Sequence, residues 1–485
     1  MKSTYLIPLI FTLASCAGSE FQNASIKPIN QDMVQNIDYK AIPRIAVSGE
    51  PIEAKTMSEY ANDLGVPAAT MALYKNGELI YQEFKGDGIG PDSLFQGASL
   101  AKSVSGAAIA TLASREGISL DEDVSKYITS FDLTSLDGYQ APVTLRQLLS
   151  HTSRADVGGF EGYPRTVDIP TNLEVILGSE KSNTKRVSFS RPAGKWFYSG
   201  GGYQIAQAFA EDVSGIPFDQ LAQELVIDPV GMSRSSYIQS MDPEAIEPLT
   251  PVSGFESSGP VEGGWHNYPE LATAGLWTTA EDYGKFILAV MAAASGDTNT
   301  GILPAVAKEM LTVAGNPNPI RGYGLGFGIL LNDDGSVQSF EHHGKNVGYR
   351  VSFSAFPKER AVSIVLTNHP AGLMLATESN RGFGDSLGYI DPAASMVTRE
   401  PFTDNLRTRC LGVFAVEETP DQHVYLMEEN NSIIFKNDTA DYPLVHLGDG
   451  SFLYLATNAK FQCKATEQGV TLSLGSSTLY VKQEQ

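Results

Sequence analysis

The stretch Phe95-Gln-Gly-Ala-Ser-Leu-Ala-Lys-Ser-Val-Ser-Gly-Ala-Ala-Ile-Ala110 passes from a short polar turn into a helix of small apolar residues. Residues i and i+3 of a helix share one face, so the amine of Lys102 can reach the hydroxyl of Ser99. A serine becomes a good nucleophile when a neighbouring base takes its proton, and a lysine whose pKa is lowered by burial can be that base. We expect Ser99 in the first helical turn, where unpaired backbone N–H groups favour negative charge. The stretch therefore predicts a nucleophile and its base within one turn of chain.

The same spacing occurs a second time, at Ser182-Asn-Thr-Lys185. No apolar period surrounds this copy, which lies in a polar run, so we interpret it as a solvated loop. Because the motif is short, a catalytic interpretation of either copy needs partner residues elsewhere in the chain.

Length and composition limit the possible functions. The chain has 485 residues, enough for two domains, and its 42% hydrophobic and 19% charged content is typical of a folded globular protein. A formal net charge of −22 argues against nucleic-acid partners and against electrostatic attraction to anionic lipid. The chain has no Gly-x-Ser-x-Gly elbow, no His-Glu-x-x-His motif and no phosphate-binding glycine loop, and we expect neither a metal nor a cofactor.

The N-terminus is typical of an exported protein. Residues 1–16 carry one positive charge followed by an apolar run too short to span a bilayer, and they end in Leu13-Ala-Ser-Cys16. This ending resembles the bacterial lipobox, which implies that Cys16 is lipidated; an ordinary signal peptide is the alternative. Ala17 and Gly18 follow, which resembles the sorting pattern for the outer membrane. We therefore expect a lipid-anchored protein of the bacterial cell envelope, on the periplasmic side of the outer membrane, with residues 17–50 as a tether.

Within a predicted domain of residues 51–391, strand patterns gather near the two ends of residues 60–370, and helical patterns fill the middle. Asn76-Gly77 separates two alternating runs within residues 68–85, which is a strong hairpin signal. Further strands are expected within 323–331, 336–341, 349–356 and 361–367, and helices at 104–115, 144–149, 202–214, 218–225 and 280–293. The pattern predicts an α/β (α+β) domain, in which an antiparallel sheet made from both chain ends is flanked by helices and a helical subdomain walls off a cleft.

The sequence changes character beyond about residue 392. Short alternating runs separated by turns such as Gly448-Asp-Gly predict a small all-β domain over residues 400–485, either a sandwich or a barrel. Cys410 and Cys463 both lie there, and in an oxidising compartment they are candidates for a disulfide. We find no catalytic cluster in this domain and expect a packing or binding role.

Two segments downstream of Ser99 carry residues suited to acyl transfer, which needs a second proton-transfer group and a site for an oxyanion. Tyr198 precedes Ser199 and three glycines, a pattern that favours close approach of the backbone to another element. His342 and His343 precede Gly344, between expected strands. Taken singly, each is better explained by ordinary structure, the tyrosine as a core aromatic and either histidine as a hydrogen-bonded strand residue.

Taken in order, these motifs resemble those of the serine hydrolases of the class C β-lactamase and penicillin-binding protein-like family. The resemblance rests on Ser-x-x-Lys at 99–102, Tyr-Ser at 198–199 and His-x-Gly at 342–344. Leu-Leu-Ser-His-Thr-Ser at 148–153 and Gly-Leu-Trp-Thr-Thr-Ala-Glu-Asp at 275–282 match weaker landmarks. The resemblance covers roughly residues 50–390 and implies a β-lactamase/transpeptidase-like fold, while the last 85 residues resemble the β-barrel extension of some members.

The resemblance also implies a role for each matching residue. Ser99 would attack the acyl carbon, and Lys102 and Tyr198 would share the proton transfers, with either as the general base. His342 stands where many relatives have lysine and others histidine, and would donate to the substrate or to Tyr198.

Other positions carry weaker expectations. The oxyanion would be bound by the backbone N–H groups of Ser99 and of Lys345, the residue after Gly344. We interpret His151 as structural, holding the turn after its helix, and leave His266 unassigned.

Gly200 departs from the family pattern, in which the tyrosine motif usually ends in an asparagine that binds the substrate amide. A buried amide without a partner costs about 1–3 kcal/mol, or about tenfold or more in transition-state binding. We therefore expect an esterase or a D-amino-acid peptidase or carboxypeptidase that acts on a small-molecule ester, peptide or β-lactam, with peptidoglycan as a further candidate partner. A true β-lactamase of the class C type and a non-enzymatic cell-wall-binding protein are the alternatives.

Overall fold

A computed structural model describes most of the chain. The described residues are 39–51, 54–239, 248–318, 321–389, 395–416, 419–429, 432–436, 441–455, 459–467, 469–474 and 478–483. The expected leader, its Cys16 and residues 17–38 of the expected tether lie outside them and stay predictions.

An eight-stranded antiparallel sheet is the centre of the larger domain. Its strand order is β11-β12-β13-β14-β15-β16-β2-β3, so the N-terminal hairpin completes a sheet made mostly from residues 315–367. The turn of that hairpin, Asn76-Gly77, has φ of +55° and +81°, as a tight two-residue hairpin requires. This arrangement confirms the predicted sheet made from both chain ends. Its strands are β2 (Ala69–Lys75), β3 (Glu78–Lys85), β11 (Gly315–Asn318), β12 (Arg321–Tyr323), β13 (Gly328–Leu331), β14 (Val337–Asn346), β15 (Tyr349–Phe356) and β16 (Ala361–Thr367).

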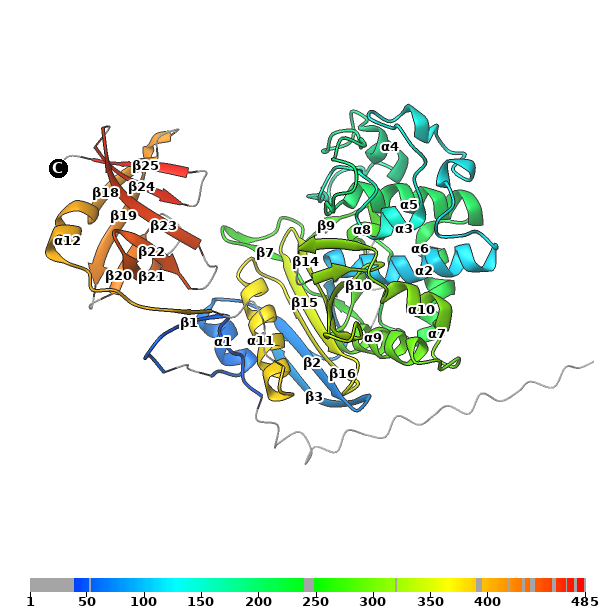
Figure 1. Ribbon diagram of the computed structural model, residues 1–485, viewed down its shortest axis with the longest axis horizontal. Coiled ribbons are helices and arrows are strands. Elements are labelled where there is room, and N and C mark those ends of the chain that lie inside the picture. The colour runs from blue at the N-terminus through cyan, green and yellow to red at the C-terminus, as the bar shows by residue number, and fades with distance from the viewer. Residues whose placement is uncertain are drawn as a thin grey trace, which may run out of the picture. The chain divides into compact units, whose positions relative to one another are not determined.

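Helices cover both faces of this sheet (Figure 1). Helix α11 (Gly372–Ser386) packs on β15 and β16, with α1 (Met57–Asp63) beside it. Helix α9 (Ala280–Ala294) packs on β16 and β2 from the other side. Strand β16 is buried at every position, which explains why its sequence is mostly apolar.

A helical region lies between β3 and β11 in the sequence. None of the helices in the described ranges is long and apolar enough to cross a bilayer. The helices of this region are α2 (Ala101–Arg115), α3 (Leu145–Leu149), α4 (Asn172–Leu177), α5 (Gly200–Ser214), α6 (Phe218–Ala222), α7 (Asp228–Val230), α8 (Leu271–Ala274), α9 and α10 (Pro304–Met310).

Three local predictions need correction. The expected strand over 323–331 is interrupted, because the chain turns at Gly326 (φ +87°) and passes so close to the backbone of α2 that a side chain there would collide with Ser103. The helix expected at 218–225 ends in a π-helical turn, Gln223–Ile227. His342 and Gly344 lie within β14 and not between strands, because β14 stays paired with β15 as far as Asn346.

The expected tether is shorter than predicted at its C-terminal end. Tyr39 and Ile45 are buried, and β1 (Ile45–Val47) pairs in parallel with β17 (Ser395–Val397). Residues 39–50 therefore contain folded chain, because their apolar side chains pack against residues far away in the sequence.

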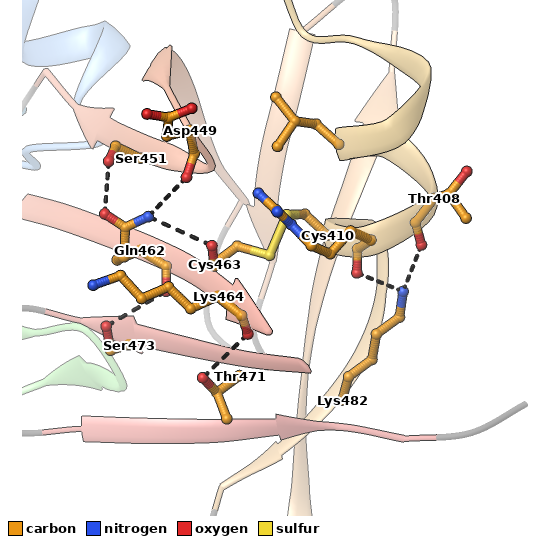
Figure 2. Close-up of a disulfide and its surroundings, with 12 residues drawn as sticks. Thr408, Cys410, Asp449, Ser451, Gln462, Cys463, Lys464, Thr471, Ser473 and Lys482 are labelled. Carbon is orange, nitrogen blue, oxygen red and sulfur yellow. Dashed lines mark hydrogen bonds between the residues drawn. A yellow bond between two sulfur atoms is a disulfide. The ribbon is translucent and has the colours of Figure 1, made fainter. Parts of the chain in front are cut away.

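The C-terminal region forms a closed β-barrel, which confirms the predicted all-β domain and selects the barrel over the sandwich. The buried Cys410, at the end of α12 (Asp404–Cys410), forms a disulfide with the equally buried Cys463 on β23 (Figure 2). The two sulfurs thus join the helix to the barrel core. The barrel strands are β18 (Gly412–Val416), β19 (Thr419–Glu429), β20 (Ser432–Lys436), β21 (Asp441–Gly448), β22 (Ser451–Tyr454), β23 (Ala459–Thr466), β24 (Gly469–Leu474) and β25 (Thr478–Lys482).

Candidate active site

Ser99 stands at a sharp corner of the chain. Strand β4 (Ser93–Gln96) leads through Gly97 into a 3-10 turn, Ala98–Leu100, and α2 follows at once. Ala98 is buried with φ +47°, a left-handed conformation that is costly for a non-glycine residue and is found at tight functional turns. Ser99 thus lies in the 3-10 turn just before α2 and not in the first α-helical turn that we expected.

Lys102 is fully buried in the first turn of α2. Its Nζ lies 3.0 Å from the Ser99 hydroxyl and donates to the carbonyl of Thr273, also at 3.0 Å. Burial lowers the pKa of Lys102 to about 7, because the charged amine loses its hydration. The small side chains of α2 allow neighbouring elements to pack closely around this helix and so to bury Lys102. At neutral pH a large fraction of this amine is therefore unprotonated beside the serine.

Tyr198 reaches the same serine from the segment before α5. Its hydroxyl hydrogen-bonds the Ser99 side chain, and its ring centre lies 5.0 Å from the Lys102 amine. Burial raises the pKa of Tyr198, and the hydrogen bond to Ser99 opposes this shift only in part. The next residue, Ser199, caps α5 by accepting from the Gly202 N–H at 2.9 Å. The tyrosine thus lies against the nucleophile as a neutral phenol.

His151 supports Tyr198, which goes beyond the turn-holding role that we expected for it. Its Nδ1 accepts the backbone N–H of Ser199 at 3.1 Å, and its ring centre lies 4.4 Å from that of Tyr198. Since a backbone N–H can only donate, Nδ1 of His151 carries no proton. Burial holds the pKa of His151 well below its usual range, so the ring stays neutral. His151 itself has φ +64°, which directs the chain toward this contact.

His342 faces the site from β14 but does not bond Tyr198, which corrects one of its two expected partners. Its Nδ1 donates to the His343 carbonyl at 2.7 Å, so Nε2 accepts the Tyr323 hydroxyl at 2.8 Å. Burial keeps the pKa of His342 well below its usual value. The His342 and Tyr198 ring centres are 6.0 Å apart. His343, the next residue of the strand, is exposed and also lines the cleft over Ser99.

The expected oxyanion residues lie where β14 passes the nucleophile. A β-carbon on Gly344 would stand 2.8 Å from the Ser99 backbone nitrogen, so only glycine allows the strand this close. Lys345 follows on the same strand and lines the cleft above Ser99. Gly200 does not line the cleft, because the ring of Phe160 lies in front of it.

A cleft of about 670 Å³ opens over Ser99. Four aromatic residues line it, and the ring of Trp196 contacts those of Tyr198 and Tyr323; the fourth is Phe160. Charged side chains also contribute, among them Lys345 and an ion pair between Arg321 and Glu341. In the described ranges no group of three or more histidine, cysteine or acidic side chains is arranged to hold a metal.

Sequence reasoning missed Tyr323, Phe160 and the carbonyl of Thr273. Tyr323 opens a run in which glycines alternate with apolar residues, a signal of close approach that we interpreted only as a strand. Phe160 follows Gly158-Gly159, and no motif marks it. His266, left unassigned, donates from Nδ1 to the Glu161 carbonyl at 2.8 Å and so holds the loop that carries Phe160.

Comparisons with known proteins identify the family of the chain. A model of the Beta-lactamase family matches residues 54–382. Esterase EstB of Burkholderia gladioli is 25% identical over 316 residues, which cover 57% of this chain and 78% of EstB. A class C β-lactamase structure has a TM-score of 0.52 at 17% identity and covers 69% of this chain and 94% of that one.

The octameric penicillin-binding protein homologue from Pyrococcus abyssi is similar over a longer stretch. Its TM-score is 0.55 at 20% identity, and the match covers 87% of this chain and 97% of the other. The family model spans 329 of the 485 residues, from 54 to 382, so this structural likeness extends beyond it. The family model therefore matches more than half of this chain. The chain belongs to the β-lactamase family of serine hydrolases.

Proposed function

We propose that this protein hydrolyses carboxylic esters through an acyl-enzyme on Ser99. The observation that supports this most directly is the Ser99 hydroxyl 3.0 Å from the fully buried amine of Lys102, beneath an open cleft. A nucleophile and a base in direct contact are what an acyl transfer to serine requires.

The acylation step follows from the positions of these groups. Ser99 Oγ attacks the ester carbonyl carbon while its proton passes to Lys102 Nζ. The backbone N–H groups of Ser99 and Lys345 stabilise the oxyanion. The bond to the alcohol oxygen then breaks, and that oxygen takes a proton from Tyr198, which recovers one from the Lys102 ammonium. Water attacks the acyl-enzyme by the same proton route, restores Ser99 and releases the carboxylic acid.

The pKa values favour Lys102 over Tyr198 as the base in acylation. Burial lowers the pKa of Lys102 to about 7 but raises that of Tyr198, so at neutral pH the amine is available as a base and the phenol is not. Tyr198 then serves as a neutral relay between the lysine and the leaving group. His342, neutral and bonded to Tyr323, positions the wall of the cleft and is not a base.

A peptidase that releases a D-amino acid is the second candidate. Lys345 lines the cleft with its side chain exposed, and its amine can pair with the free carboxylate of a peptide. Gly200 supports the ester over an amide or a β-lactam, because position 200 supplies no hydrogen-bonding side chain for a substrate amide. The relative EstB is named as an esterase, in agreement with the first candidate.

Labelling with a fluorophosphonate probe tests the nucleophile. We expect the wild type and Ser182→Ala to react equally and Ser99→Ala not to react. Equal labelling of the Ser99→Ala variant would show that the assignment of Ser99 is wrong. Turnover of p-nitrophenyl acetate, nitrocefin and a D-Ala-D-Ala peptide then ranks the substrates, with the ester expected first. Comparable rates on nitrocefin and on the ester would overturn the preference for esters.

We also propose that Cys16 is lipidated and anchors the enzyme in the cell envelope, on the periplasmic side of the outer membrane, where peptidoglycan is a candidate partner. The support is the Leu13-Ala-Ser-Cys16 ending and the absence of aspartate after it. Metabolic labelling with an alkyne fatty acid should mark the wild type and not Cys16→Ser. Equal labelling of both proteins would refute the anchor.

A further inference from the structure

The space beside Gly200 is filled by an aromatic ring from another segment. A β-carbon at position 200 would stand 2.7 Å from Cε2 of Phe160 and 3.2 Å from the methyl group of Thr273. Contacts under 3.0 Å do not occur for real β-carbons, so any side chain at position 200 requires the ring to move. Gly200 has ordinary helical backbone at the start of α5, so the ring of Phe160, and not backbone strain, accounts for the glycine.

The same ring also faces the substrate. Phe160 lines the cleft over Ser99 and keeps 9% of its surface exposed. Gly158 and Gly159 precede it in the lining and contribute only backbone. This part of the wall therefore offers an acyl group carbon atoms from Phe160 and no side-chain hydrogen-bond donor.

A buried carboxylate holds the loop before Phe160 in place. Asp156 is 2% exposed and accepts the N–H of Ser188 at 2.7 Å and its hydroxyl at 2.9 Å, and it is ion-paired with Lys185. Val157 has φ +61°, a left-handed conformation that a β-branched residue adopts only when its surroundings impose it.

Contacts with α5 and with β9 (His266–Asn267) complete the anchoring of this loop. The N–H of Gly201 donates to the Val157 carbonyl at 3.0 Å. After Phe160, the Glu161 carbonyl is bonded to His266 at 2.8 Å. With anchors on both sides, the ring has a defined position set by the fold.

We propose that Phe160 is a specificity-determining residue of the acyl site. It occupies the volume into which a side chain at position 200 would project, and it replaces a polar contact by an apolar wall. The enzyme thereby selects acyl groups with a hydrocarbon chain and disfavours acyl groups that carry an amide next to the reacting carbonyl. This inference rests on the ester hydrolysis proposed above.

A matched pair of substrates measures this selectivity. p-Nitrophenyl pentanoate and the p-nitrophenyl ester of N-acetylglycine have the same leaving group and the same number of chain atoms, and they differ in the internal amide. The ratio of their kcat/KM values, compared between variants, cancels their different intrinsic reactivity. In the wild type the amide of the N-acetylglycine ester has no partner, and we expect this to lower kcat/KM for that ester relative to the pentanoate by about tenfold or more.

Three variants separate the ring from the glycine. Gly200→Asn alone forces the ring into the cleft, so kcat/KM should fall for both esters and their ratio should stay within about threefold of the wild type. In Phe160→Ala/Gly200→Asn the amide side chain has room, and the ratio should move toward the N-acetylglycine ester by about tenfold relative to Phe160→Ala. The Gly200→Ser substitution in the same Phe160→Ala background is the substitute if the asparagine variant does not fold.

Trp196→Ala/Gly200→Asn is the matched control, because Trp196 is another aromatic residue of the same cleft. Its ratio of kcat/KM values for the two esters should equal that of Trp196→Ala alone. The proposal is overturned if Gly200→Asn alone shifts the ratio as far as the double variant, or if the double variant matches Phe160→Ala. Either result leaves wild-type ester turnover intact, whereas failure of the proposed function would appear as activity in Ser99→Ala.

Discussion

Two copies of the same four-residue pattern have opposite environments in this protein. Lys102 is completely buried, and its amine contacts Ser99 and the carbonyl of Thr273. The side chain of Lys185 is 69% exposed and ion-pairs with Asp156, while the Ser182 hydroxyl bonds Thr184. We predicted a solvated loop for the second copy, and exposure of Lys185 agrees with this, although the ion pair with a buried carboxylate was not foreseen.

The difference shows what the spacing alone cannot supply. A lysine becomes a base at neutral pH only when burial removes its hydration without providing an anion, since a paired carboxylate stabilises the charged form. Lys102 meets both conditions, because it is buried and its partners are a hydroxyl and a carbonyl, whereas Lys185 is exposed and paired with a carboxylate and meets neither. The second lysine instead has a structural task, because it helps to hold the loop that carries Phe160.

The largest expected effect is the loss of activity when the buried lysine is replaced. Lys102→Met should lower kcat for p-nitrophenyl acetate by about 10³-fold or more, because Ser99 loses its proton acceptor. Lys185→Met should change kcat by less than about threefold. Stopped-assay rates with active-site titration measure both. Similar losses in the two variants would remove the functional distinction between the two motifs.

A smaller effect is expected in the pH dependence. The neutral amine of Lys102 is the reactive form and its pKa is about 7, so kcat/KM should fall about tenfold per pH unit below that value and level off above it. The pKa of His342 lies well below its usual value, so it adds no inflection near neutrality. Lys185→Met should leave the profile unchanged. A profile that is flat from pH 5 to 9 would contradict Lys102 as the base.

The smallest effect is in stability, where the two lysines should differ in sign. The folded-state pKa of Lys102 lies below its unfolded value, so the folded state binds fewer protons and burial costs free energy at low pH. Lys102→Met should therefore raise the free energy of unfolding at pH 7 by about 1–3 kcal/mol, and the gain should shrink as pH rises toward 10.

Lys185→Met should instead lower the free energy of unfolding by about 0.5–1 kcal/mol, because it removes a partner of the buried Asp156. The pKa of Asp156 is lowered in the folded protein, even though burial alone raises it, so its contribution is present at pH 7 and is lost only in acid. Urea unfolding of both variants gives the two values. The same sign in both variants would refute the contrast.

Local patterns were sufficient to predict much of the fold. Asn76-Gly77 marked the hairpin, an apolar run marked β16, alternation marked β15 and the barrel strands, and the small-residue run after Ser99 marked α2. The predicted ends of strands and helices were wrong where residues distant in the sequence contact the element. The strand expected at 323–331 breaks because Gly326 meets the backbone of α2, a contact that no local period encodes.

The candidate site likewise contains residues that the sequence predicted and residues that only the structure reveals. The order Ser99, Lys102, Tyr198 and His342 was visible in the sequence. The structure brings the serine, the tyrosine and the histidine to one cleft, with the buried lysine in contact with the serine. The partners of His342 and His151 were predicted incompletely, because a ring nitrogen bonds whichever group the tertiary fold places beside it. Tyr323 and Phe160 come from segments without a motif, so only their spatial neighbours reveal their roles.

The sequence by itself determined which groups can react, because side-chain chemistry and spacing along one helix are local properties. It placed a serine three residues before a lysine twice, and it put glycine where a family asparagine is usual. Only the tertiary structure decided which lysine loses its water and which ring fills the space beside Gly200. Burial and shape depend on residues distant in the chain, and these two quantities distinguish a catalytic amine from a surface amine and an apolar wall from an amide site.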